Sequence, residues 1–295
     1  MRIFLTGATG FIGSAIIPEL INAGHRVIGL ARSDAGAKAL VDAGAQVHRG
    51  DLEDLESLRS GAAASDGVIH CAFNHDFSKY VANCEADRRA VEALGSVLEG
   101  SDRPLIVTSG TAVVFSSGRV ATEEDPPAPS SGGIPRSASE EAAASLVLRG
   151  VRAIAMRLPQ VHDRVKQGLI TYLIDLAREK GVSAYAGDGR NRWPAAHVLD
   201  TARLYRLALE KGSAGARFHA VAEEGVPLRD IAEAIGRRLE MPVVSKSPED
   251  AAAHFGWLGF FVGLDAPASS ALTRQRLGWR PVQSSLLTDL AHLSP

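Results

Sequence analysis

Met1-Arg-Ile-Phe-Leu-Thr-Gly-Ala-Thr-Gly-Phe-Ile-Gly13 opens the chain, and this stretch decides the fold. Its apolar run, Ile3 to Leu5, ends at the first of three glycines, and apolar residues at helical spacing follow from Ile16 to Ile21. A strand, a glycine turn and a helix in this order are the context in which G-x-x-G-x-x-G predicts a dinucleotide-binding turn.

The glycines have a physical reason. A diphosphate binds the N-terminal amides of the following helix, where the helix dipole favours negative charge. Side chains at Gly7 or Gly10 would keep the diphosphate away, and one at Gly13 would lift the helix off the strand. The alternative is an ordinary tight turn, and the spacing and flanking elements argue against it.

Composition excludes several classes of protein. The chain has 295 residues, of which 45% are hydrophobic and 22% charged, and this length suits one large α/β domain with a smaller lobe. The net charge is −2, so the chain lacks the excess of basic residues that is typical of nucleic-acid-binding proteins. Apolar stretches are too short to cross a membrane, and a strand starting at residue 2 leaves no room for a signal peptide, so we expect a cytoplasmic protein. Cys71 and Cys84 indicate neither a disulfide framework nor a metal site.

Strands and helices alternate along the first half of the chain. This pattern predicts an α/β fold, a Rossmann-type doubly wound parallel sheet with a small C-terminal substrate-binding lobe. We expect an NAD(P)-binding domain in residues 1–160 and, in residues 161–295, mainly a substrate-binding lobe that is interleaved with the sheet. The predicted strands are 26–31, 45–50, 67–72, 104–111 and 151–157, after the first one.

The residues that end the second strand indicate which dinucleotide binds. Enzymes that use NAD usually place Asp or Glu there, whereas this sequence has Ala31-Arg32-Ser33. A guanidinium matches a phosphate with paired N–H donors, so the sequence favours NADP(H) over NAD(H). The alternative is that Arg32 is a solvated loop residue.

Ligand-binding residues are also predicted after the third and fourth strands, where open α/β sheets bind ligands. Asp51, next to Leu52, either meets the adenine amine or caps the helix that carries Leu55. The loop from Phe73 to Tyr80 contains His75, Asp76 and Lys79. Residues 119–135, rich in Pro, Ser and Gly, form a loop that we expect to line or cover the site.

These features resemble the extended or atypical short-chain dehydrogenase/reductase superfamily, which contains nucleotide-sugar epimerases and dehydratases. The resemblance covers essentially the whole chain, and its N-terminal motif is the most specific. The matching stretches are Thr6–Gly13, Gly50–Leu52, His70–Ala72, Thr108–Ser109, Arg157–Pro159 and Leu277–Pro281.

The resemblance fails at the catalytic pair. The family uses Tyr-x-x-x-Lys, in which Tyr acts as acid or base and Lys lowers its pKa. None of the four tyrosines here has a lysine four residues on, and Arg136 and Glu140 occupy the aligned positions. Arg136 cannot shuttle a proton near neutral pH, but it can bind a carboxylate or stabilise an oxyanion. Glu140 can accept hydrogen bonds from ribose; alternatively, the two form an ordinary i, i+4 surface pair.

Other proton donors and hydroxyls are therefore candidates. The family's catalytic Ser or Thr follows the fifth strand, where Ser109 or Thr111 can bond a carbonyl oxygen unless Gly110 fills that slot. His75 and His162 titrate in the useful range. The predicted catalytic residues are Ser109, Thr111, Arg136, His162 and His75. The predicted cofactor-binding residues are Gly7, Thr9, Gly10, Phe11, Ile12, Gly13, Arg32, Ser33, Asp51, Leu52, Cys71, Ala72, Phe73, Glu140 and Leu158.

Three functions are consistent with the sequence. The first is an NADP(H)-dependent oxidoreductase of a small carbonyl or hydroxyl compound, in which water, His162 or His75 supplies the proton. The second is a non-catalytic NADP(H)-binding sensor, and the third is a nucleotide-sugar epimerase or dehydratase. We expect a small-molecule substrate, no nucleic-acid or membrane partner, and a monomer or homodimer.

Overall fold

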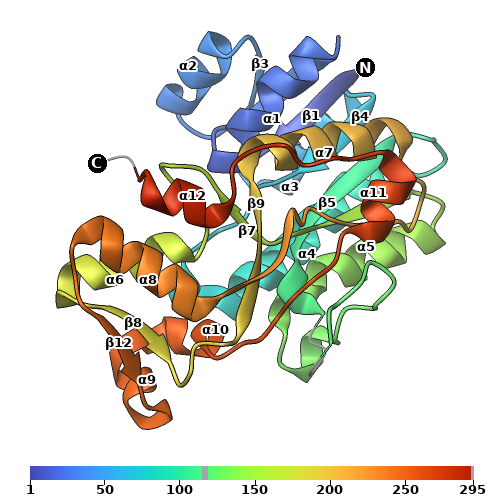
Figure 1. Ribbon diagram of the computed structural model, residues 1–295. Coiled ribbons are helices and arrows are strands. Elements are labelled where there is room, and N and C mark those ends of the chain that lie inside the picture. The colour runs from blue at the N-terminus through green and yellow to red at the C-terminus, as the bar shows by residue number, and fades with distance from the viewer. Residues whose placement is uncertain (115–118, 294–295) are drawn as a thin grey trace.

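The computed structural model describes residues 1–114 and 119–293, with a seven-stranded parallel sheet at its centre (Figure 1). The strand order is β10-β6-β5-β4-β1-β2-β3, and each neighbouring pair runs parallel. The predicted Rossmann-type fold is thereby confirmed. The strands are β1 (Arg2–Thr6), β2 (Arg26–Ala31), β3 (Gln46–Arg49), β4 (Gly67–His70), β5 (Pro104–Gly110), β6 (Arg152–Leu158) and β10 (Arg217–His219).

Helices cover both faces of the sheet, which explains why its inner strands are apolar along their whole length. Along β1, Ile3 and Leu5 face one core and Phe4 faces the other. The first face is covered by α1 (Phe11–Asn22), α2 (Asp34–Asp42) and α7 (Val198–Lys211). The second is covered by α3 (Leu55–Ala63), α4 (Tyr80–Ser96) and α5 (Ala138–Leu148).

The lobe has an apolar core of its own, built around small sheets of order β11-β9-β7 and β12-β8. Figure 1 shows it at the end of the molecule that carries α6, α8 and α9. Its strands are β7 (Gln160–His162), β8 (Ser183–Ala186), β9 (Arg192–His197), β11 (Glu223–Pro227) and β12 (Val243–Lys246). Its helices are α6 (Ile170–Lys180), α8 (Leu228–Leu239), α9 (Pro248–Phe255), α10 (Gly259–Val262) and α12 (Leu286–Ala291).

The second half of the chain also contributes one helix and one strand to the dinucleotide domain. α7 packs beside α1, and β10 extends the main sheet next to β6 (Figure 1). The loop 119–135 packs on the C-terminal segment, because Ala121 pairs with Ala268 and Glu123 accepts hydrogen bonds from Thr273. Within residues 1–114 and 119–293, no helix has the length and apolar character needed to span a membrane.

Trp279 fixes the C-terminal segment to the sheet. It follows α11 (Ala271–Leu277), is fully buried in the core shared by α1 and α7, and donates from Nε1 to the Asp200 carbonyl at 2.9 Å. The Asp200 carboxylate then accepts hydrogen bonds from the amides of Val282 and Gln283. The end of the chain is thus part of the core of the dinucleotide fold.

We predict that Trp279→Ala lowers the free energy of unfolding by about 3–5 kcal/mol, because it leaves a large cavity and an unpaired carbonyl. Urea denaturation followed by circular dichroism measures this loss. The control is Leu148→Ala, at a side chain that is 91% exposed, and we expect a change within about 0.5 kcal/mol. A loss of the same size in both variants would contradict the assignment of Trp279 to the core.

Candidate functional site

The glycine turn after β1 lies against the backbone that follows β4. Gly7 has a φ of +68°, and a Cβ there would lie 2.7 Å from the Ala72 nitrogen. A Cβ on Gly13 would lie 2.1 Å from the Gly7 carbonyl oxygen, so α1 packs directly on the turn. This packing against the backbone after β4 by itself requires glycine at position 7. The approach of a diphosphate to Gly7 stays a prediction.

The N-terminus of α1 is open. Gly10 and Thr9 are exposed, and a Cβ on Gly10 would meet only the Gly7 carbonyl oxygen, at 3.1 Å, among the atoms described. No side chain of the described residues caps α1, and its first turn has no acidic residue. The amides of Phe11 and Ile12 stand at the positive end of the helix dipole. This cradle fits an anionic diphosphate.

The end of β2 presents Arg32 at the surface. Arg32 is exposed and forms no ion pair with the rest of the described chain, whereas Arg49 of the neighbouring β3 pairs with Asp34. Ser33 caps α2, since its Oγ accepts a hydrogen bond from the Gly36 amide at 3.1 Å. The guanidinium of Arg32 is therefore available to a ligand at this edge of the sheet.

Asp51 follows β3, and its Oδ1 accepts a hydrogen bond from the Glu53 amide at 3.0 Å. The next helix, α3, is capped by Asp54, which accepts from the Ser57 amide at 3.1 Å. The alternative in which Asp51 caps this helix is wrong, because Asp54 stands directly before its first turn. Half-buried Leu52 packs against the core under α3. A contact between Asp51 and adenine stays a prediction.

A chain of buried polar side chains runs from β1 to the start of α5. Thr6 and His70 end adjacent strands, and Thr6 Oγ1 lies 2.8 Å from His70 Nδ1. His70 Nε2 lies 3.0 Å from Oδ1 of Asp87 in α4, whose Oδ2 is 2.8 Å from Nη1 of Arg136. An ionised carboxylate only accepts, so Nε2 carries the proton and Nδ1 accepts from the Thr6 hydroxyl.

Arg136 is fixed on three sides. Besides Asp87, it bonds the Thr108 carbonyl through Nη2 at 2.7 Å, and its guanidinium carbon lies 4.4 Å from the centre of the Phe73 ring. Burial raises the pKa of Asp87, but the charge of Arg136 and the contact with His70 outweigh this, and the pKa is held well below its usual range. Both charges of the pair therefore persist at neutral pH.

Glu140 is not where the sequence placed it. Its two oxygens accept from Nε and Nη2 of Arg157, each at 2.8 Å, and both side chains are buried. The expected surface pair between Arg136 and Glu140 is wrong, because each residue pairs with a buried charge on a different element. We also withdraw Glu140 as a ribose ligand, since Arg157 engages its carboxylate from within the protein.

The hydroxyl groups of Ser109 and Thr111, at and just after the end of β5, are poorly accessible to a substrate. Ser109 is buried in register with Arg157, and its Oγ has no partner among the described atoms. Thr111 is also buried and donates to the Leu158 carbonyl at 3.4 Å. A Cβ on Gly110 would meet only that carbonyl oxygen, at 3.8 Å, within the described chain. Gly110 therefore leaves space where a side chain would otherwise project.

The loop after β4 brings His75 to the site. Cys71, Ala72 and Phe73 are half-buried, whereas His75 is exposed, with its ring centre 5.3 Å from that of Phe73. Partial burial and the charge of Arg136 lower the pKa of His75 below 6.5, so its imidazole is mostly neutral at pH 7. Burial raises the pKa of Cys71 to about 11, so its thiol stays protonated.

His162 is withdrawn as a proton donor. It is fully buried in β7, with Nδ1 2.8 Å from Asp289, and Nε2 has no hydrogen-bond partner in the described part of the structure. Burial lowers the pKa of His162 despite the opposing charge of Asp289. A substrate cannot reach this ring while the lobe keeps its packing.

Sequence reasoning missed His70 and Asp87. His70 had a signal, because two polar residues, Thr6 and His70, end neighbouring apolar strands of a parallel sheet and so lie side by side. Asp87 had none, because it lies in a helix rich in charged residues and only the packing of α4 on α5 brings it to Arg136.

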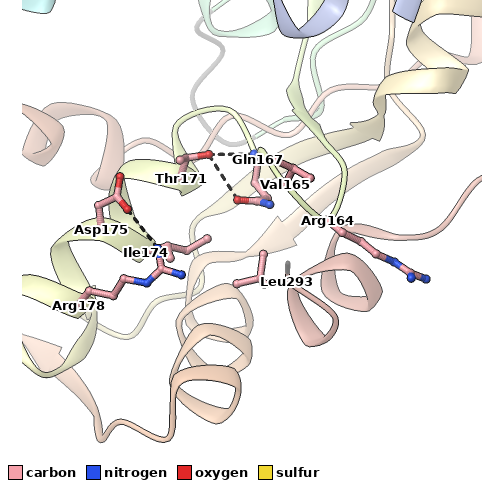
Figure 2. Close-up of a pocket in the computed structure, with 8 residues that line it drawn as sticks. All are labelled: Arg164, Val165, Gln167, Thr171, Ile174, Asp175, Arg178 and Leu293. Carbon is pink, nitrogen blue, oxygen red and sulfur yellow. Dashed lines mark hydrogen bonds and ion pairs between the residues drawn. The ribbon is translucent and has the colours of Figure 1, made fainter. Parts of the chain in front are cut away.

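The lobe contains a small cleft of about 130 Å³, lined by residues of the loop before α6, by α6 and by Leu293 (Figure 2). Its polar groups bind one another: Thr171 contacts Gln167, and Arg178 pairs with Asp175 at 3.5 Å. None of the predicted site residues lines it. We therefore place the site at the sheet edge and not in this cleft.

Comparison with known proteins defines the family. The profile of the NAD dependent epimerase/dehydratase family matches residues 3–221. The chain belongs to this family. An uncharacterized protein of Schizosaccharomyces pombe is 52% identical over 294 residues, which cover 99% of this chain and 98% of that protein.

Named relatives of this epimerase/dehydratase family member include enzymes. A decarboxylating sterol-4-alpha-carboxylate 3-dehydrogenase of Dictyostelium discoideum is 29% identical, covering 77% of this chain and 73% of that one. A farnesyl-dihydroquinoline-oxide ketoreductase of Stigmatella aurantiaca is 28% identical, covering 91% and 84%. The fold matches that of dTDP-glucose 4,6-dehydratase from Streptomyces venezuelae, solved with NAD, with a TM-score of 0.78 at 20% identity over 99% and 95% of the chains. The protein is accordingly an NAD(P)-dependent enzyme of the extended short-chain dehydrogenase/reductase type.

We predict that the buried pair of Asp87 and Arg136 is strongly coupled. Asp87→Leu or Arg136→Met alone leaves one buried charge without its partner and costs about 3–5 kcal/mol of unfolding free energy. The double variant should lose much less than the sum of the two, as measured by urea denaturation.

The matched control is the ion pair of Arg88 and Glu141, which also joins α4 to α5 but is more exposed. Its coupling should be about 1 kcal/mol or less. Additive losses at Asp87 and Arg136 would show that the pair does not stabilise the site.

Proposed function

We propose that the protein is an NADP(H)-dependent oxidoreductase that interconverts the carbonyl and hydroxyl groups of a small substrate without a Tyr/Lys pair. The observation that carries the proposal is Arg136, a guanidinium fixed at the ends of β4 and β5 beside an intact diphosphate cradle. The names of two relatives, a dehydrogenase and a ketoreductase, support this class of reaction.

The dinucleotide contacts follow from the turn and the strand ends. The amides of Phe11, Ile12 and Gly13 bind the diphosphate, and Arg32 and Ser33 bind the adenosine 2′-phosphate. Further contacts come from Thr9 and Asp51 on the adenosine side, and from the half-buried Cys71, Ala72, Phe73 and Leu158 on the nicotinamide side. When bound, the nicotinamide ring supplies or accepts a hydride at C4.

Arg136 orients the substrate oxygen and stabilises its developing negative charge. In the described contacts Nη1 bonds Asp87 and Ser139, and Nη2 bonds the Thr108 carbonyl, which leaves Nε–H and one N–H of Nη2 for a ligand. A donor held in place before the reaction costs no reorganisation as charge develops. Because a guanidinium keeps its proton at neutral pH, the proton must come from another group.

We assign that proton to His75 or to water next to it. Reduction adds a hydride to the carbonyl carbon and a proton to its oxygen, and an exposed imidazole beside Phe73 can deliver the proton. Ser109 and Thr111 have minor roles at most, because both are buried.

Two other functions are less well supported. A sensor without catalysis would need no fixed guanidinium at the site, and the relatives named above are enzymes. A nucleotide-sugar epimerase or dehydratase needs a base at position 136, and an arginine paired to Asp87 cannot act as one. Turnover of NADPH with simple aldehydes and ketones separates the oxidoreductase from the other two functions.

We predict that Arg32→Ala weakens NADPH binding by about 10- to 100-fold and NADH binding by less than about threefold, because a charged hydrogen bond to the 2′-phosphate is lost. Titration of each dinucleotide, followed by its fluorescence, measures both constants. Arg49→Ala is the matched control, since Arg49 lies on the neighbouring strand and pairs with Asp34.

Gly10→Asp should abolish binding of both dinucleotides, because it places a carboxylate in the diphosphate cradle. Equal losses of NADPH and NADH in Arg32→Ala would refute the role of Arg32 while leaving the cradle intact.

We predict a pH dependence set by His75. Its pKa is lowered below 6.5, so ketone reduction, which needs the protonated ring, is fastest below that pKa and slows as pH rises through it. The reverse oxidation needs the neutral ring and speeds up over the same range. Single-turnover NADPH oxidation gives the profile.

In His75→Gln the fall in reduction rate with rising pH, called here the pH break, should vanish. The rate itself should fall by about 10²-fold or more. His254→Gln, in α9 of the lobe, is the control and should keep the break. An unchanged profile in His75→Gln would assign the proton to water.

A further inference from the structure

Six aromatic rings connect the site to the lobe. This aromatic bridge consists of Phe73, Phe77, Tyr80, Tyr172, Trp257 and Phe261. The first three come from the loop after β4 and the start of α4, and the others from α6, from the short turn before α10 and from α10 itself. The bridge therefore joins three segments that are distant in the sequence.

The rings are in contact along the whole bridge. Phe77 stacks on Trp257, with ring centres 4.4 Å apart and planes inclined by 17°. Tyr172 meets Trp257 edge-on at 5.2 Å, and Tyr80 lies 5.8 Å from Phe77. Phe73, 6.4 Å from Tyr80, continues the bridge toward the strands.

The inner end of the bridge is the site itself. The guanidinium of Arg136 lies over the Phe73 ring at 4.4 Å, so one side chain of the bridge touches the group that holds the substrate oxygen. Gly110, at the end of β5, projects no side chain into the space near Leu158. A substrate whose oxygen meets Arg136 thus has the aromatic surface of Phe73 beside it.

The outer end of the bridge is incompletely covered. Trp257 is 45% exposed and Tyr172 is 38% exposed, whereas Trp193 and Trp279, which only pack, are 3% and 0% exposed. Large aromatic side chains that remain partly exposed beside a site commonly contact a ligand. Packing of the lobe on the sheet accounts for the buried ring faces but not for these open ones.

Three ring-to-ring steps of 6.4, 5.8 and 4.4 Å separate Phe73, which touches Arg136, from Trp257. We infer that the substrate carries an aromatic ring at the end of a chain of several bonds beyond its reacting carbonyl, and that the outer end of the aromatic bridge binds this ring while Arg136 binds the oxygen. The inference rests on the proposed function and names its substrate class. Offset and edge-on contacts between rings add attraction beyond the burial of apolar area. A saturated ring of the same size gains the apolar burial but not that attraction.

The first test compares 8-phenyloctan-2-one, whose chain is long enough to follow the aromatic bridge, with its cyclohexyl analogue. In both ketones the ring is isolated from the carbonyl, so their intrinsic reactivity is the same and only the ring differs. We expect kcat/KM for the aromatic ketone to be about three- to tenfold higher, mainly through KM. Trp257→Leu should remove this preference, and Phe260→Leu should keep it, because Phe260 contacts only Phe261 among the described rings.

The second test measures binding without turnover. Of the three tryptophans only Trp257 is exposed, so acrylamide quenches mainly its fluorescence. 8-Phenyloctan-2-one should protect Trp257 from acrylamide at concentrations where the cyclohexyl analogue does not. Phe77→Leu, which removes the stacked partner of Trp257, should weaken that protection.

The two tests separate the proposals. If neither ketone is reduced but 8-phenyloctan-2-one still protects Trp257, the reaction assignment fails and the ring site stands. Equal kcat/KM for the two ketones together with equal protection would overturn the ring site and leave the oxidoreductase in place. A Trp257→Leu variant that lowers only Tm, with the preference unchanged, would show that the bridge merely packs the lobe on the sheet.

Discussion

The contact between the glycine turn and the backbone after β4 is the constraint on which the site depends. Only glycine at position 7 allows a positive φ and an approach to Ala72 that leaves no room for a Cβ. This contact lies where the strand order reverses, between β1 and β4, and open α/β sheets bind their ligands at such a point. It sets the diphosphate cradle and Phe73 side by side, so that whatever touches Phe73 also lies next to the dinucleotide site.

Charge pairing then decides which groups face that site. Arg157 is fully buried and the Arg136 side chain is only 15% exposed, so each needs a carboxylate partner, and leaving either charge unpaired would cost several kcal/mol. Asp87 and Glu140 meet this need from α4 and α5. The pairing turns Glu140 away from Arg136, although the two are one helical turn apart. As a result the position that resembles a catalytic tyrosine holds a permanent positive charge, which suits the proposed binding of an oxygen but exchanges no proton.

Local chemistry in the sequence predicted the sheet and the cradle, because strand, turn and helix signals act over a few residues. The second strand matches its predicted bounds for this reason. The lobe's β9 and β11 were missed, since Pro194, Gly225 and Pro227 interrupt their strand pattern and only mutual pairing makes them strands. Asp87, Glu140 and His162 were misjudged or missed because their partners lie between 17 and 127 residues away in the chain.

The difference between local motifs and contacts of distant segments also applies to the cofactor site and the proposed substrate site. Residues that bind a dinucleotide lie in one turn and one helix end, so a short motif encodes them. The surface that selects a substrate is assembled from the loop after β4, from α6 and from the turn before α10, and exists only when the lobe packs on the sheet. Substitution at Trp257 or Tyr172 can therefore change the substrate without touching the cradle or Arg136. A family with one conserved architecture can diversify its substrates in this way, because the residues that choose the ring are not those that hold the oxygen.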